Sequence, residues 1–144
     1  THVSFPVLAY YRSQHANQSW VAALTAILDA CVLVLALSEH ESQRAARLTF
    51  AMARHAAVDL TLVFNLRPRP TEADRLPASD LAQVREALRA AGWVVRDVPD
   101  AEAKLRRLRE MYEPYMNALA RFLLVPLPAW RASRGARDNW TGLE

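Results

Sequence analysis

A histidine and an aspartate four residues apart are the first pair in this sequence that could do chemistry. His55 and Asp59 follow Arg54 in an alanine-rich stretch. In an α-helix this spacing places both side chains on one face, where the acid can orient the imidazole or share a metal ion with it. The di-metal sites of helical bundles use Glu-x-x-His pairs on two helices, and no such pair occurs here. We therefore predict no metal site and interpret His55 as a core histidine with an acid partner.

An acid inside an apolar stretch is the second candidate. Asp29 lies near the middle of residues 20–37, which are otherwise almost wholly apolar. A buried carboxylate without a partner costs too much free energy to be kept. If the helices on either side of residue 40 fold back on each other, Asp29 lies level with residues 51–55. We therefore expect the second helix to supply its partner, and the candidates are Arg47, Arg54 and His55.

Further polar residues could join these groups in a pocket between helices. The segment 10–20, YYRSQHANQSW, is crowded with hydrogen-bonding side chains, and we interpret it as a junction between two helices. His15 and Glu113 could approach Asp29, His55 and Asp59 if the helix faces converge. The candidate ligand-binding residues are Arg12, His15, Asp29, Arg54, His55, Asp59 and Asn117.

The motifs of the common enzyme classes are missing from the sequence. Ser13 and Ser19 lie near His15, but no glycine-bracketed nucleophile elbow accompanies them. The three glycines are dispersed, so there is no phosphate-binding loop. The single Cys31 lies in the apolar stretch, where a buried thiol is inert, and a lone cysteine excludes an intramolecular disulfide. We predict a protein that is not an enzyme and needs no cofactor.

The charge distribution does not favour nucleic acid as a partner. The chain has 144 residues, 18 basic and 15 acidic side chains and a net charge of +3. The basic residues alternate with acids, as in RRLRE at 106–110, rather than forming one long patch. This charge distribution is compatible with a small-molecule ligand bound between helices.

The spacing of apolar residues predicts an all-α fold, an antiparallel bundle of about four long helices with a short N-terminal helix. In the helix at 43–66, one stripe contains Leu48, Met52, His55, Asp59 and Leu62. Pro114 should kink the last helix or end its first half. We predict one domain over 1–130 and a polar, frayed tail over 131–144. The expected helices cover 5–13, 17–38, 43–66, 79–91 and 101–125, begun in part by the N-caps Asn17 or Ser19, Ser79 and Asp100.

The apolar stretch from Trp20 to Leu37 has the length of a membrane span. Asp29 near its centre would cost about 2.5–3.5 kcal/mol on insertion into a bilayer. A helix that is apolar all round is also typical of the centre of a soluble bundle. We interpret the stretch as a core helix.

Three blocks of this chain resemble the C-terminal cytoplasmic region of bacterial two-transmembrane, potassium-channel-like proteins. They are SFPVLAYYRSQHANQSWVAALTAILDACVLVL, ARLTFAMARHAAVDLTLVF and LRRLREMYEPYMNALARFLLVPLPAW, in this order. In such proteins a pore module with a TVGYG-like filter precedes the helical region, and no such pentapeptide occurs here. The resemblance implies a domain at the cytoplasmic face of the cell membrane that assembles or regulates the pore, and a homo-oligomer. It assigns no site residues. The alternative is a helical sensor that binds a small molecule or metal between its helices.

Overall fold

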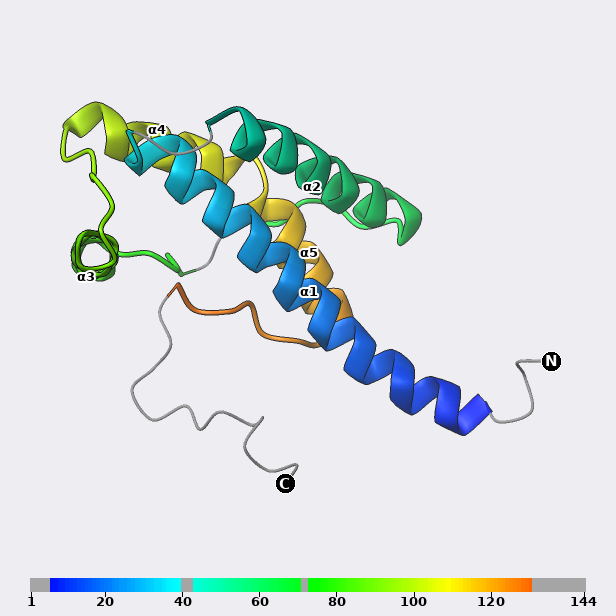
Figure 1. The fold of residues 1–144 in the computed structure, drawn as a ribbon. Helices are drawn as coiled ribbons and strands as arrows, with labels where there is room; N and C mark the ends of the chain where they lie inside the picture. Colours follow the sequence, from blue (N-terminus) through cyan, green and yellow to red (C-terminus); the bar gives the residue numbers. More distant parts are fainter. Residues whose placement is uncertain (1–5, 40–42, 71–72, 131–144) are drawn as a thin grey trace, which may run out of the picture.

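The fold of the described residues is entirely helical, which confirms the predicted all-α class. The structure is a computed structural model, and it describes residues 6–39, 43–70 and 73–130, with the side chains of residues 6–19 left out. The predicted tail at 131–144 lies outside the described residues. The helices, labelled in Figure 1, are α1 (Pro6–Leu37), α2 (Gln43–Val63), α3 (Ala78–Ala90), α4 (Pro99–Glu110) and α5 (Glu113–Leu123).

The first helix is one continuous element, and the predicted break between helices at 5–13 and 17–38 is wrong. Residues 14–19 continue the helix because QHANQS contains neither glycine nor proline to interrupt it. Asn17 and Ser19 are therefore interior residues rather than N-caps. A helix of this length extends about 48 Å, and its N-terminal half projects beyond the other helices (Figure 1).

The polar break predicted after residue 37 is present, because α1 ends at Leu37 and α2 begins at Gln43. The Gln43 amide donates to the carbonyl oxygens of Val34 (2.8 Å) and Ser38 (3.2 Å). The bond to Ser38 satisfies an acceptor beyond the helix end, whereas the Val34 carbonyl also accepts from the backbone N–H of Ser38. The turn thus reverses the chain direction and packs α2 against α1.

The core forms around α1, which packs against α2, α4 and α5. From α2 it receives the stripe Ala46, Phe50, Ala53 and Ala57, and the small alanines let the two helices approach closely. The stripe predicted from the sequence lies on the opposite side of α2, where Leu48 and Met52 are 63% and 66% exposed. The helix therefore has two apolar stripes, and periodicity alone does not decide which one is buried.

The predicted last helix is two helices. Glu110 ends α4 and Glu113 begins α5, so Pro114 occupies the first turn of a new helix, where its missing N–H costs nothing. The predicted N-caps also move. Ser79 and Asp100 lie inside the first turns of α3 and α4, and no side chain caps either helix.

Three of the described helices end in the same hydrogen-bonded motif, in which the first or second residue after the helix has a positive φ. At Asn65, Gly92 and Leu124 φ is 55°, 94° and 55°. In each case the next residue donates to a carbonyl five positions back, as from Leu66 to Thr61, Trp93 to Leu88 and Val125 to Ala120. Glycine and asparagine suit this conformation, whereas leucine does not. The helix-terminating role predicted for Gly92 is confirmed.

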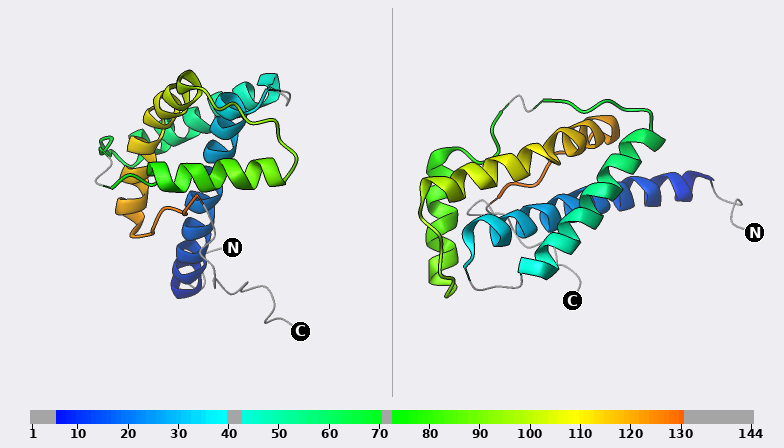
Figure 2. Two further views of the ribbon diagram at one scale, coloured as in Figure 1. Left: turned by 90° about the vertical axis from the view of Figure 1, so that its left-hand side faces the viewer. Right: turned by 90° about the horizontal axis from the view of Figure 1, so that it is seen from above.

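The helices do not form the predicted four-helix antiparallel bundle. α2 and the α4–α5 pair run antiparallel to α1, whereas α3 crosses the end of the molecule at a steep angle (Figures 1 and 2). Leu81 and Val84 of α3 are nevertheless part of the hydrophobic core. The connector after α3 contacts the end of α1 through one bridge between Ser38 and Val95. As predicted, the described residues contain no sheet.

The C-terminal part of α1 combines the properties of a membrane span and of a core helix. Trp20–Leu37 is long and apolar enough to cross a membrane, and half of this segment is buried within the fold. Its buried residues include Val21, Leu28 and Val32. Length and composition alone do not distinguish the two roles.

Candidate functional site

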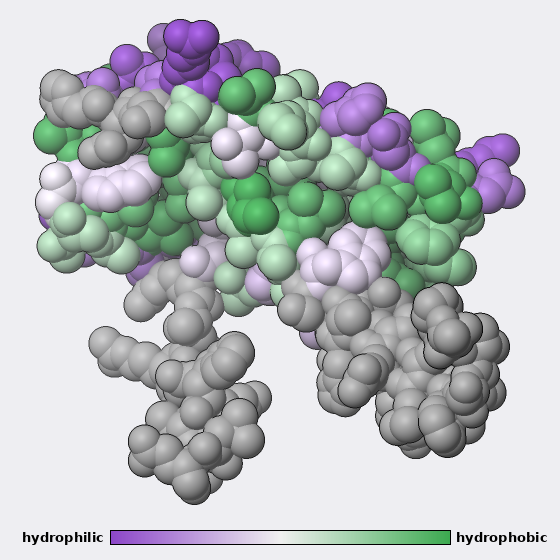
Figure 3. Space-filling view, turned by 45° about the vertical axis from the view of Figure 1, so that its right-hand side comes forward, coloured by the Kyte–Doolittle hydropathy of each residue, from purple (hydrophilic) through white to green (hydrophobic). Residues whose placement is uncertain are grey.

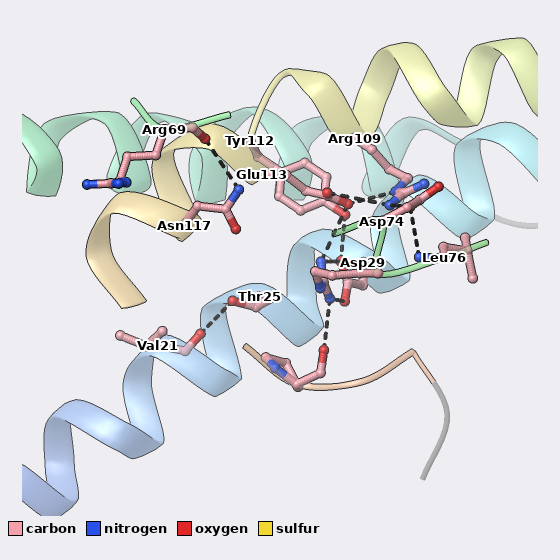
Figure 4. A network of polar contacts seen from close by, with 12 residues as sticks. Val21, Thr25, Asp29, Arg69, Asp74, Leu76, Arg109, Tyr112, Glu113 and Asn117 are labelled. Carbon is pink, nitrogen blue, oxygen red and sulfur yellow. Dashed lines mark hydrogen bonds and ion pairs between the residues drawn. The ribbon is translucent and has the colours of Figure 1, made fainter. Parts of the chain in front are cut away.

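The buried acid of α1 binds an arginine and a tyrosine from distant parts of the chain. Arg75 donates from Nη2 to Oδ2 of Asp29 (2.6 Å) and from Nη1 to Oδ1 (3.3 Å). Tyr112, fully buried between α4 and α5, donates its hydroxyl to Oδ1 at 2.5 Å. Figure 4 shows Tyr112 pointing toward Asp29 on α1. The prediction that Asp29 is buried and paired is confirmed, but the prediction that its partner comes from α2 is wrong.

A second acid and a second arginine extend this group. Arg75 reaches Glu113 at 3.5 Å, and Arg109 donates from Nε to Glu113 at 2.6 Å and from Nη2 to Asp74 at 2.7 Å. Asp74 also accepts from the backbone N–H of Leu76, which orders the loop that carries Arg75. We call this set the charged cluster, and its members are Asp29, Asp74, Arg75, Arg109, Tyr112 and Glu113.

The segment after α5 closes over the charged cluster. Arg75 donates from Nη2 to the carbonyl oxygen of Pro128 at 3.1 Å. The ring of Trp130 lies 5.3 Å from the Arg75 guanidinium and 5.7 Å from that of Arg109, within the range of cation–π attraction. The cluster therefore connects α1, the loop before α3, the α4–α5 junction and the segment 124–130.

Burial and ion pairing act in opposite directions on these groups. Burial raises the pKa of Asp29, although the Arg75 hydrogen bond and charge and the Tyr112 hydrogen bond oppose the rise. Burial, together with the charge of Asp29, raises the pKa of Tyr112 far above its usual value. Hydrogen bonds from Arg109 and Leu76 lower the pKa of the more exposed Asp74. Tyr112 and the arginines thus stay protonated at neutral pH.

This arrangement is suited to holding segments together rather than to catalysis. Tyr112 cannot act as a base at neutral pH, and both arginines are occupied by carboxylates at short distance. No nucleophilic hydroxyl or thiol belongs to the cluster. Among the described residues, no group of three or more His, Cys, Asp or Glu side chains could hold a metal ion. The chemistry available here is mutual neutralisation of buried charge.

The structure distributes the predicted site residues over separate places. His55 and Asp59 form an exposed pair at 3.1 Å, with side chains 78% and 55% exposed, so His55 is not the core histidine that we predicted. Arg54 donates to the carbonyl oxygen of Met111 at 2.8 Å and lies over the ring of Tyr115. Asn117 donates to the carbonyl oxygen of Arg69 at 3.3 Å (Figure 4). The side chains of the remaining two, Arg12 and His15, lie outside the described residues.

Of the predicted convergences, Asp29 and Glu113 do come together, with Arg75 between them. Arg75, Arg109 and Asp74 were not predicted from the sequence as members of the cluster. The i, i+4 spacing of Arg109 and Glu113 was a usable signal for one pair. Arg75 stands in a proline-containing loop, and no local pattern connects it with α1.

No protein-family model, curated protein or solved structure matches this chain. The resemblance to potassium-channel-like proteins therefore remains an interpretation of the sequence blocks alone.

Proposed function

We propose that this chain is a non-catalytic assembly and regulatory domain at the cytoplasmic face of a membrane, joined to a potassium-channel-like pore module. In this proposal, copies of the domain associate through the outer face of α2. The sequence resemblance supports the pore module and the location. The exposed stripe of α2 supports the self-association. The charged cluster is consistent with a non-catalytic role, since its ionised groups pair with one another. Asp74, Arg109 and Glu113 also line a hollow at the surface.

The exposed stripe has the spacing of a coiled-coil seam. Its positions are separated alternately by four and three residues, which is the a/d pattern that keeps one side of a helix facing a partner helix. The three apolar members are 63–69% exposed and contact little of the fold. The seam consists of Leu48, Met52, His55, Asp59 and Leu62.

The seam is complementary to itself in the antiparallel direction. Two α2 helices centred at the level of residue 57 place Met52 of each copy opposite Leu62 of the other. The same alignment places His55 opposite Asp59 twice, so hydrogen-bonding groups also meet. A two-fold contact of this kind closes and does not propagate into fibres. Two heptads make a weak contact, but attachment to a common pore raises the effective concentration of the copies to about millimolar.

A disulfide test measures this alignment directly. In a Cys31→Ser background, the double variant Met52→Cys/Leu62→Cys should form covalent dimers on oxidation. The thiol at position 52 of each copy then lies opposite the thiol at position 62 of the other copy. The single variants M52C and L62C place no thiol opposite another and serve as matched controls. Equal cross-linking in all three variants would contradict the alignment.

Sedimentation equilibrium at about 0.5 mM tests the association itself, in the concentration range where tethered copies act. We expect reversible self-association that Leu48→Glu/Met52→Glu abolishes. Val94→Glu/Val98→Glu, which adds the same charge to valines 52% exposed elsewhere, should leave it intact. A strict monomer at this concentration would refute assembly through α2.

The pore module has its own test, namely whether the reading frame before Thr1 encodes two membrane spans and a selectivity filter.

A further inference from the structure

The ends of α2 and α5 form a surface that neither the core nor the α2 seam uses. A hollow there is lined by the arginines Arg67, Arg69 and Arg121 and by Phe122, and none of the described residues that line it is acidic. Val63 and Phe64 lie beside it at the end of α2, and Leu124 follows α5. Figure 3 shows apolar and hydrophilic side chains mixed on this side of the molecule. We call these seven residues the basic–apolar patch.

The three arginines of the patch differ from the five described arginines that form ion pairs. Elsewhere Arg75, Arg85, Arg89, Arg96 and Arg109 pair with carboxylates. Within the described part of the chain, the exposed guanidinium groups of the patch have no ion pair or hydrogen bond. Three positive charges thus surround one hollow, and none of the described acidic side chains pairs with them. The chemistry that complements them is a cluster of anionic groups.

The apolar part of the patch is unusually open to solvent. Val63 is 75% exposed and Leu124 is 89% exposed, and the rings of Phe64 and Phe122 stack on the surface with centroids 5.1 Å apart. Leu124 moreover has the left-handed conformation that Asn65 and Gly92 adopt at equivalent helix ends. An exposed leucine in a conformation unfavourable for leucine is not explained by folding stability.

We propose that the basic–apolar patch binds the surface of a bilayer that contains anionic lipids. Guanidinium groups around exposed leucine, valine and phenylalanine match both layers of such a surface: the arginines bind lipid phosphates while the apolar side chains enter the boundary with the acyl chains. A duplex nucleic acid would complement the arginines but leave the apolar side chains in water. A second copy of the chain would bring its own arginines against these, since the patch holds no acid.

The place of the patch in the fold agrees with contact at a membrane. The ends of α2 and α5 lie toward the same end of the molecule as the projecting N-terminal half of α1 (Figures 1 and 2). The α2 seam and the patch use different residues. Lipid binding therefore adds a contact to the proposed membrane-attached assembly, and either proposal can fail without the other.

Vesicle co-sedimentation tests the proposal. The probes are vesicles of phosphatidylcholine alone and vesicles with about 30% phosphatidylserine, each mixed with the 144-residue chain. Each arginine near an anionic surface should strengthen binding about fivefold, so Arg67→Gln/Arg69→Gln/Arg121→Gln should weaken it about a hundredfold. The matched control Arg44→Gln/Arg47→Gln/Arg107→Gln removes the same charge elsewhere and should retain most of the binding.

The apolar part has its own variant and its own readout. Phe122→Ser/Leu124→Ser should weaken binding to the same vesicles while leaving its salt dependence unchanged, because only the arginines release counterions. Circular dichroism of each variant verifies the helical fold. Equal binding to both kinds of vesicle, no binding to either, or an equal loss in the two arginine variants would overturn the proposal. So would tighter binding to a DNA duplex than to the anionic vesicles, or a loss of self-association in the patch variants.

Discussion

Replacing Arg75 with methionine should destabilise the fold by an amount that depends on pH. Among the described residues, Arg75 is the only cation that binds Asp29 directly, so Arg75→Met leaves a buried carboxylate with Tyr112 as its one described hydrogen-bond donor. Breaking a buried ion pair in this way costs about 3–5 kcal/mol. The free energy of unfolding of a domain is about 5–15 kcal/mol, so the loss is a large fraction of it. The melting temperature should fall by roughly 10–15 °C at neutral pH.

The pH dependence follows from the pKa of Asp29. Burial raises this pKa above the unfolded value even with Arg75 present, and removing Arg75 removes the largest opposing cause, so the pKa rises further. Between the unfolded and folded pKa values the native state holds a proton that the unfolded state has released. Stability therefore falls as pH rises through this window. The loss caused by Arg75→Met should be largest near pH 7.5 and much smaller near pH 4.5.

Urea unfolding followed by circular dichroism at the two pH values measures both quantities. Asp74 contributes to the pH dependence with the opposite sign, because its pKa is lowered and the stability it gives is lost as pH falls through that pKa. This contribution is the same in the wild type and in Arg75→Met, so it cancels when their free energies of unfolding are subtracted. The control is Asp29→Asn/Arg75→Met, which removes both charges and keeps a side-chain oxygen for Tyr112. It should be more stable than Arg75→Met at neutral pH. A loss below about 1 kcal/mol, a loss equal at both pH values, or a double variant no better than the single one would refute this account of the cluster.

Two further predictions concern single positions. Leu124→Gly should raise the free energy of unfolding by about 0.5–1 kcal/mol, since glycine tolerates the left-handed conformation and the leucine side chain makes few contacts that would be lost. Urea unfolding measures this free energy, and a lower value for the variant would contradict the assigned helix end. Cys31 is 7% exposed, and burial raises the pKa of its thiol. A thiol reagent should therefore modify Cys31 slowly in the native chain and quickly in urea. Fast modification of the native chain would contradict the burial of this face of α1.

Local patterns in the sequence predict the helices better than they predict the contacts between helices. The turn after Leu37 and the end at Gly92 were predictable because each depends on residues close in sequence. The buried face of α2 was not, because both of its sides carry apolar residues at helical spacing. The burial of Ala46, Ala53 and Ala57 depends on how closely α1 approaches, which is a property of the pair of helices.

The charged cluster shows the same limit for the candidate site. The need of Asp29 for a partner follows from its apolar surroundings, so the prediction of a buried pair succeeded. The identity of the partner depends on where residues 73–77 lie relative to α1, and no periodicity in the sequence specifies that position. Of the cluster pairs, the sequence spacing pointed only to Arg109 and Glu113.

Asp29 also distinguishes the two environments that the apolar half of α1 could enter. In a bilayer this acid would cost about 2.5–3.5 kcal/mol, with no partner supplied by the lipid. In the fold it is matched by Arg75 and Tyr112, but only after the loop before α3 and the α4–α5 junction have packed over α1. The core packing of this helix is thereby coupled to segments 46 and 83 residues away along the chain. Asp29 thus disfavours insertion of this segment of α1 into a bilayer, although the segment has the length and apolarity of a membrane span. It also makes the burial of this segment in the fold depend on the packing of the rest of the domain.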